Sequence, residues 1–186
     1  MGKLIYSMQV SADGYVNNIR GGFEWAAPDD DVLEYILERM QGVSAYVYGR
    51  RYYETMTSWA DLRSVPGLKE LDYRFSDLWN ATPKYVYSTT LTEARTPNTT
   101  FLREFDPVFL RGLADSGEKH VTVEGTTIAA QALRAWLIDG VSIYYVPIAT
   151  GGGTPFWPAD VPLRLRLIDE QRFESGIVNV RYAPIY

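Results

Sequence analysis

Short apolar runs alternate with helical patterns along most of this 186-residue chain. The runs are rich in β-branched and aromatic residues and are bounded by turn residues, as buried strands are; they lie at 4–10, 45–48, 85–87, 121–123 and 141–146. Between them, apolar residues recur at helical spacing over 29–41, 67–80, 106–117 and 127–138. Because strands that alternate with helices form parallel sheets covered on both faces, this order predicts an α/β domain.

The pattern changes after Pro158. Leu163, Leu165 and Leu167 alternate with polar residues, and a second alternating run at 177–182 follows Gly176. Two such runs separated by a turn predict an antiparallel hairpin that closes the sheet. No repeat, low-complexity tract or linker divides the chain. We therefore expect one domain over 1–186, with a mixed, mostly parallel sheet and helices on both faces.

The charge balance restricts the class of partner. Lys and Arg number 18 against 23 Asp and Glu, a formal net charge of −5, whereas nucleic-acid binding needs a basic face. No apolar run approaches the roughly 18–20 residues that span a bilayer, so we expect neither nucleic acid nor a membrane as a partner. The chain has no cysteine, which excludes disulfides and thiolate chemistry. It enters a strand pattern at once, without a signal-peptide pattern, which favours a cytoplasmic protein.

Several common catalytic signatures are missing. The sequence has no phosphate loop of the Gly-x-x-x-x-Gly-Lys type, no Gly-x-Gly-x-x-Gly after the first strand, and no Gly-x-Ser-x-Gly. The single histidine, His120, stands where a strand is expected to begin and is interpreted as structural. A histidine-based hydrolase or a multi-histidine metal site is therefore not expected, and no metal ligand is assigned.

Six short segments carry a resemblance when they are taken together. Each follows an expected strand or opens an expected helix, and they lie at 11–15, 25–31, 48–54, 84–91, 123–127 and 151–158. In this order and at these spacings, the chain resembles the dihydrofolate-reductase-like family over about residues 3–184. Within that family it is most similar to the reductase domain of the bacterial bifunctional riboflavin enzyme. The resemblance implies the dihydrofolate-reductase-like fold, NADPH as the cofactor, a small-molecule substrate and a homodimer.

The segments at two strand ends have residues suited to a phosphate. Gly49, Arg50 and Arg51 would open a helix, whose first amides favour anions, and guanidinium groups pair with phosphate. The resemblance places them at the adenosine phosphates, which favours NADPH over NADH; otherwise they are solvated surface residues. Three hydroxyl residues follow the next strand: Ser88, Thr89 and Thr90. The same resemblance places them beside the adenosine of the cofactor; the alternative is that they form a local turn.

A third segment would hold the pyrophosphate. A helix is expected to begin after Gly125, and the resemblance implies cofactor contacts at Gly125, Thr126, Thr127 and Ile128. It also places Val16 in the loop that covers the nicotinamide. The family usually has two adjacent glycines here, whereas this chain has Glu124-Gly125. Because a carboxylate beside phosphate is unfavourable unless it points away, Glu124 is left out of the predicted contacts.

The substrate residues are implied by the resemblance alone. Asp30 falls where dihydrofolate reductases carry the carboxylate that holds the substrate ring, and it is the candidate catalytic acid. The alternative is an acid that stabilises a helix start, since Asp29 and Asp31 flank it. Substrate contacts are expected at four further positions: Gln9, Trp25, Tyr53 and Trp157. Core packing would equally explain Gln9, Tyr53 and Trp157, as it would Val16.

The resemblance implies an NADPH-dependent reductase that transfers a hydride to a C=N or C=O carbon of an aminopyrimidine or pterin-like substrate. The resemblance is to 5-amino-6-(5-phosphoribosylamino)uracil reductase of riboflavin biosynthesis, without the deaminase half, whose zinc site needs a cysteine pair. Dihydrofolate reduction, reduction of another imine or carbonyl compound, and a non-catalytic nucleotide-binding protein are the alternatives. A substrate phosphate would need a second basic spot, which the sequence does not single out among Arg20, Arg63 and Arg74.

Overall fold

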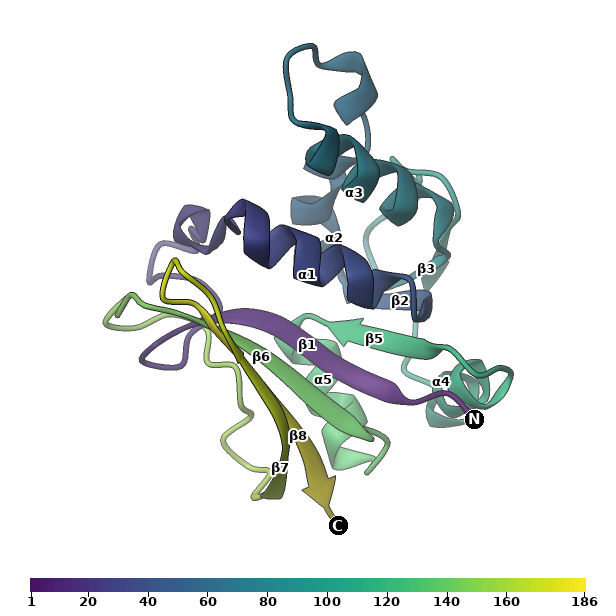
Figure 1. Cartoon of the computed structure of the whole chain (residues 1–186). Coiled ribbons are helices and arrows are strands. Elements are labelled where there is room, and N and C mark those ends of the chain that lie inside the picture. The colour runs from purple at the N-terminus through teal and green to yellow at the C-terminus, as the bar shows by residue number, and fades with distance from the viewer.

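The computed structural model describes residues 1–186, and its centre is an eight-stranded sheet in the order β4-β3-β2-β5-β1-β6-β8-β7 (Figure 1). The pairs from β4 across to β6 are parallel, and β8 and β7 add as an antiparallel hairpin. This confirms the predicted mixed sheet. The strands are β1 (Leu4–Ser11), β2 (Val43–Gly49), β3 (Lys84–Tyr87), β4 (Thr99–Leu102), β5 (His120–Glu124), β6 (Gly140–Val146), β7 (Arg164–Arg172) and β8 (Val178–Ile185).

Five α-helices connect the strands, and three single turns of 3-10 helix accompany them. They are α1 (Asp30–Met40), α2 (Arg50–Met56), α3 (Glu70–Ala81), α4 (Pro107–Asp115) and α5 (Thr126–Arg134), with η1 (Glu24–Ala26), η2 (Thr57–Trp59) and η3 (Leu62–Ser64). Asp106 caps α4 as predicted, because its carboxylate accepts from the backbone amides of Val108 and Phe109 at 2.8 and 3.1 Å. No helix is both long and apolar enough to cross a membrane.

Two helix ends differ from the prediction. The helix expected over 67–80 begins at Glu70, because Gly67 has a φ of +83°. The helix expected over 127–138 ends at Arg134, since Trp136 adopts a φ of +58° and turns the chain toward β6. The short strand β4 was not predicted, because its polar start and four-residue length give little alternation.

The two faces of the sheet carry different apolar cores. Along β2, Ala45 and Val47 pack into the cluster under α4 and α5, whereas Tyr46 and Tyr48 pack into the cluster under α1, α2 and α3. This division follows from the two-residue period of a strand. Figure 1 shows α1 lying across the sheet on one side, with α5 on the other.

The topology brings the polar loops to one edge. The chain runs outward from β1 to β2, β3 and β4, then β5 inserts between β2 and β1, and β6 joins the other side of β1. Because these six strands are parallel, the segments that follow them meet at their common carboxyl end. Ligands of open α/β sheets bind at this edge, where the strand order reverses.

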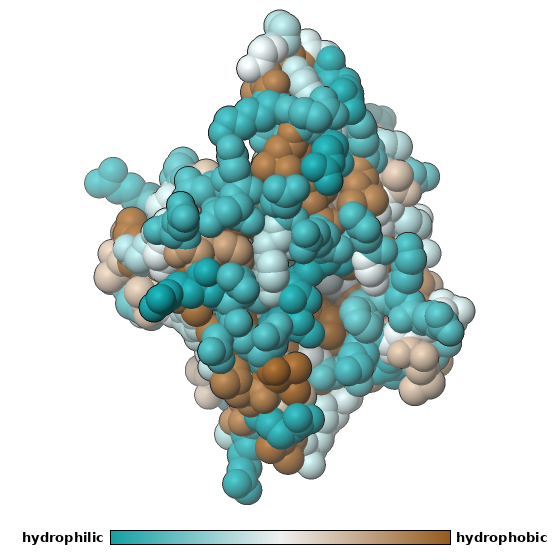
Figure 2. Space-filling model, in the orientation of Figure 1, coloured by the Kyte–Doolittle hydropathy of each residue, from teal (hydrophilic) through white to brown (hydrophobic).

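Most of the visible surface is hydrophilic (Figure 2). Apolar residues gather on this face where the β7–β8 hairpin lies, and Leu167, Ile168 and Ile185 of that hairpin are exposed. Strand β7 is also an edge of the sheet. The hairpin therefore combines an unpaired edge with apolar surface.

Candidate functional site

A cleft of about 1790 Å³ follows the carboxyl edge of the parallel strands. It brings together every residue predicted to contact a cofactor, together with Gln9 and Asp30 from the predicted substrate set. The cofactor set that lines it comprises Val16, Gly49, Arg50, Arg51, Ser88, Thr89, Thr90, Gly125, Thr126, Thr127 and Ile128. Segments far apart in the sequence thus form one continuous wall, and their role toward a cofactor stays a prediction.

The turn at Gly125 brings two helix starts close together. Gly125 has a φ of +111°, and a Cβ there would lie 3.1 Å from the backbone nitrogen of Gly49. Only glycine combines that backbone with so close an approach. Thr126, Thr127 and Ile128 follow as the first turn of α5, whose amides have no partner within the helix and favour an anion.

Three of the four arginines that line the cleft follow strands β2 and β4. Arg50 and Arg51 are exposed at the start of α2, and Arg103, directly after β4, donates to the backbone oxygen of Ser88. Sequence reasoning missed Arg103 because β4 itself was not predicted. The Ser88 hydroxyl accepts from the amides of Thr90 and Leu91 at 3.3 and 3.0 Å, so it forms the local turn given above as its alternative.

Two loops are joined along another wall. Asp13 accepts from the Ser11 hydroxyl at 2.6 Å and from the amides of Thr150 and Gly151 at 3.0 and 2.8 Å. These hydrogen bonds, chiefly that from Ser11, lower the pKa of Asp13 to about 2. The amide of Thr154 likewise donates to Asn17 at 2.8 Å. The loop that carries Val16 is therefore attached to the loop after β6.

Asp30 is at the rim of the cleft and already has a partner. Both carboxylate oxygens accept from the Nζ of Lys69, at 2.7 and 2.8 Å. The two side chains are 64% and 66% exposed, so solvent screens the pair strongly. A substrate ring would compete with Lys69 for this carboxylate.

Three aromatic residues predicted to contact substrate line neither the cleft nor the cavity next to it. The Tyr53 side chain is in the core, and its hydroxyl lies 3.1 Å from both Thr96 Oγ1 and the amide of Arg95, so its contact with a substrate stays a prediction. Trp25 packs against the small apolar cluster around Tyr144, and Trp157 packs edge-on against Phe156. Core packing explains all three.

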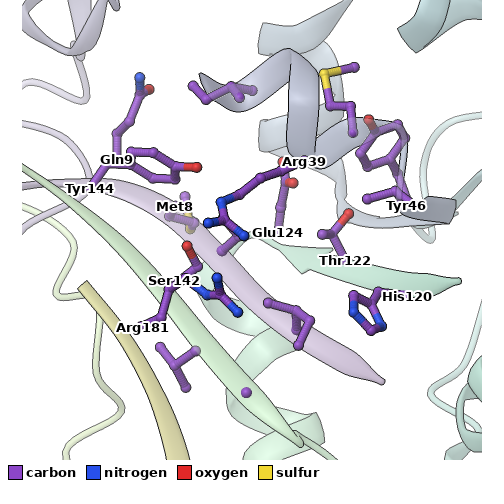
Figure 3. A pocket seen from close by; sticks show the side chains of 18 of the residues that line it. Met8, Gln9, Arg39, Tyr46, His120, Thr122, Glu124, Ser142, Tyr144 and Arg181 are labelled. Carbon is purple, nitrogen blue, oxygen red and sulfur yellow. The ribbon is translucent and has the colours of Figure 1, made fainter. Parts of the chain in front are cut away.

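A second cavity, of about 620 Å³, continues from the cleft beneath α1 (Figure 3). Met8, Gln9 and Tyr52 line both spaces. The side chain of Glu124 points into this cavity, beside Tyr52 and Thr122, and burial raises its pKa to about 8. The alternation of β5 could have identified Glu124, since Val121 and Val123 face the opposite core.

The RibD C-terminal domain family model matches residues 2–179. The chain belongs to this family. A protein assigned to riboflavin biosynthesis in Shewanella sp. PV-4 superposes with a TM-score of 0.76 at 21% identity, covering 99% of both chains. RibD of Acinetobacter baumannii gives 0.70 at 14% identity, covering 100% of this chain and 58% of that one. Dihydrofolate reductase of Enterococcus faecalis, in a complex with NADP(H), gives 0.61 at 13% identity, covering 98% and 96%.

These neighbours establish the dihydrofolate-reductase-like fold for this RibD C-terminal domain. The chain corresponds to little more than half the length of the Acinetobacter protein. A comparison with curated protein sequences finds no match. Membership of the family makes the chain an oxidoreductase of the pyrimidine-reductase-like kind.

Proposed function

We propose that this RibD C-terminal domain is an NADPH-dependent reductase that transfers a hydride to a C=N or C=O carbon of a small aminopyrimidine or pterin-like substrate. One observation carries the proposal: a cleft lined by arginines and two helix starts meets a cavity that holds a carboxyl group with a raised pKa. The two spaces join at Met8 and Gln9. A reducible carbon at that junction would lie between a hydride source on one side and a proton source on the other.

The cleft residues fit NADPH. Gly125 permits the close approach of a pyrophosphate to the first turn of α5, because a side chain would fill that space. Arg50, Arg51 and Arg103 offer a guanidinium cluster for a further phosphate, which distinguishes NADPH from NADH. When bound, NADPH supplies the hydride. The loop joined through Asp13 would exclude water from the nicotinamide end.

Glu124 would hold the proton. A C=N carbon that receives a hydride leaves a nitrogen that must be protonated, and the general acid should have a pKa near the working pH. With a pKa of about 8, the Glu124 carboxyl is mostly protonated at neutral pH. It faces the cavity in which the substrate ring would lie.

Asp30 is the candidate for the carboxylate that holds the substrate ring. Both of its oxygens accept from Lys69, in an exposed pair that solvent screens strongly. Asp30 as the ring-binding acid therefore stays a prediction that requires Lys69 to move.

Thermal unfolding with each nucleotide tests the cofactor. At a hundredfold excess over Kd, binding stabilises a protein by about 2.7 kcal/mol, which corresponds to roughly 5–10 °C for a domain of this size. We expect that shift with NADPH and little with NADH, and a smaller NADPH shift in Arg103→Gln. Arg134→Gln is the matched control, because Arg134 pairs with Asp160 outside the cleft. No shift with either nucleotide would refute NADPH as the cofactor, whereas a shift without turnover would favour the non-catalytic nucleotide-binding alternative.

Turnover is tested by following NADPH oxidation with a panel of aminopyrimidines, pterins and simple imines.

The homodimer is a separate prediction, supported by the apolar β7–β8 hairpin at the edge of the sheet. Light scattering of the full chain would test it, and a monomer mass would refute it.

A further inference from the structure

The end of β5 and the start of α2 bring a carboxyl group and a tyrosine together. Glu124 is the last residue of β5 and directly precedes Gly125. Tyr52 lies in the first turn of α2, and a Cβ on Gly125 would lie 3.7 Å from the Cβ of Tyr52. The first turn of α2 is therefore packed against the turn that follows Glu124.

Tyr52 lies where the cleft and the cavity beneath α1 join. It lines both spaces, whereas Glu124 lines the cavity alone. Figure 3 shows Glu124 and Thr122 rising from β5 into that cavity. The Tyr52 hydroxyl is hydrogen-bonded to the Glu124 carboxyl. This bond connects the acid in the cavity to a residue of the cleft wall.

The ring of Tyr52 is fixed by its neighbours. It packs at a tilt against the ring of Tyr48, with 5.4 Å between the ring centres. The buried Tyr48 hydroxyl accepts from Nε1 of Trp79 at 2.9 Å. Tyr52 also packs against the apolar clusters on both faces of the sheet. A hydrogen bond from a ring held in this way gives the carboxyl a defined direction.

Burial gives the two hydrogen-bonded groups different roles toward a proton. It raises the pKa of the Tyr52 hydroxyl well above its ordinary 10, so this group keeps its proton at any working pH. Burial also raises the pKa of Glu124, to about 8, while the bond from Tyr52 lowers it. Glu124 can therefore release a proton near neutral pH while Tyr52 remains a donor.

The other titratable groups around Glu124 do not replace this bond. Tyrosine hydroxyls face it from β2 and β6: Tyr46, Tyr48 and Tyr144. His120, at the other end of β5, has a pKa lowered chiefly by burial and is neutral at pH 7. Charged side chains line the same cavity without contributing to the pKa of Glu124: Lys3, Glu38, Arg39, Asp139, Arg166 and Arg181. Two of them, Arg39 and Arg181, pair with Asp169.

We propose that Tyr52 is a positioning residue for the acid: its hydroxyl holds the Glu124 carboxyl at the junction of the two spaces and donates to the carboxylate once the proton has left. This proposal rests on the proposed function. In the transfer, the O–H bond of Glu124 breaks as an N–H bond forms on the substrate nitrogen, while the O–H bond of Tyr52 stays intact. The Glu124 carboxylate regains a proton from water before the next turnover.

Tyr52→Phe removes the hydroxyl and keeps the ring. Because a hydrogen bond to a charged group is worth about one pKa unit or more, the alkaline limb of kcat, where Glu124 loses its proton, should move about one unit to higher pH. A packing role alone would lower kcat at every pH and leave that limb in place. Tyr186→Phe is the matched control, because its hydroxyl donates to the backbone oxygen of Ile138 outside both spaces.

The Glu124 carboxyl can also be titrated without turnover, by NMR of protein isotope-labelled at its glutamate carboxyl carbons. The Glu124 resonance is the one absent from Glu124→Gln protein. We expect its midpoint to rise by about one pH unit in Tyr52→Phe and to stay unchanged in Tyr186→Phe. Added to Glu124→Gln, Tyr52→Phe should not lower the residual kcat further, because the residue that it positions is already gone.

Failure of this proposal and failure of the proposed function give different results. If Tyr52→Phe folds, by circular dichroism, and leaves both the Glu124 midpoint and the alkaline limb unchanged, the positioning role is overturned while the reductase stands. If wild-type protein oxidises no NADPH with any substrate of the panel, the reductase and the positioning role both fall, and a raised midpoint in Tyr52→Phe then shows the hydrogen bond alone.

Discussion

Replacing Glu124 by Gln should make the protein more stable at high pH. Burial raises the pKa of this carboxyl from its ordinary 4.5 to about 8. Between these values the unfolded chain has released the proton while the folded chain still holds it, so the free energy of unfolding falls as the pH rises. Each pKa unit is worth about 1.4 kcal/mol, so the loss across the window is at most about 5 kcal/mol. Glu124→Gln removes it.

Chemical unfolding of both proteins between pH 5 and 9 measures this difference. The two should have similar stability near pH 5, and the variant should gain on the wild type until about pH 8, where the difference becomes constant. In melting temperature the gap should reach roughly 10 °C for a domain of this size. Glu118→Gln, which replaces an exposed carboxyl in the turn before β5, is the control. If the free energies of unfolding of the wild type and Glu124→Gln change with pH in the same way, the Glu124 carboxyl does not have a raised pKa in the folded protein.

Four further substitutions test other features of the site. Gly125→Ala should cost about 1–3 kcal/mol of stability and weaken NADPH binding. Gly67→Ala is its control and should cost stability alone, because Gly67 has a positive φ but open space around it. If titration gives the Gly125→Ala and Gly67→Ala variants the same affinity for NADPH, the proposed pyrophosphate contact at Gly125 is refuted. Asp13→Asn should speed hydrogen exchange of the amides that its carboxylate accepts from, and unchanged exchange would refute the joined loops. Tyr53→Phe should lower stability by about 1 kcal/mol in urea without changing turnover, and a loss of kcat would support its predicted substrate contact. Asp30→Asn should abolish turnover and spare NADPH binding if the carboxylate holds the substrate ring; full turnover would leave it a helix-start acid that pairs with Lys69.

The sequence predicts the fold well because the fold depends on local patterns. The alternation of apolar runs and helical spacing gave five of the six parallel strands and the antiparallel hairpin. It failed where the signal is conformational: Trp136 takes a left-handed φ that aromatic residues seldom adopt, so the end of α5 could not be read. Strand β4 was not predicted because four residues are too few to show an alternating pattern. The place of Arg103, which directly follows β4, was therefore not predicted either.

The meeting of the cleft residues could be predicted because most of them directly follow strands. The contacts around the cavity beneath α1 could not, because they depend on pairings across the fold. Asp169 and Arg39 meet only through the packing of α1 against the hairpin, and the contact of Lys69 with Asp30 depends on where α3 begins. Glu124 could be predicted in part. The alternation of β5 shows which face of the sheet its side chain is on, but the cavity that it faces is formed by segments far apart in the sequence.

The insertion of β5 between β1 and β2 also determines when the chain can fold during synthesis. Both neighbours of β1, which are β5 and β6, are more than a hundred residues downstream: Tyr6 pairs with Val123 and Val141. Until a ribosome has released those residues, β1 has no partner on either side, and the nascent sheet cannot close around its own first strand. Contacts between such distant residues slow folding, so β1 must stay free of aggregation for most of translation.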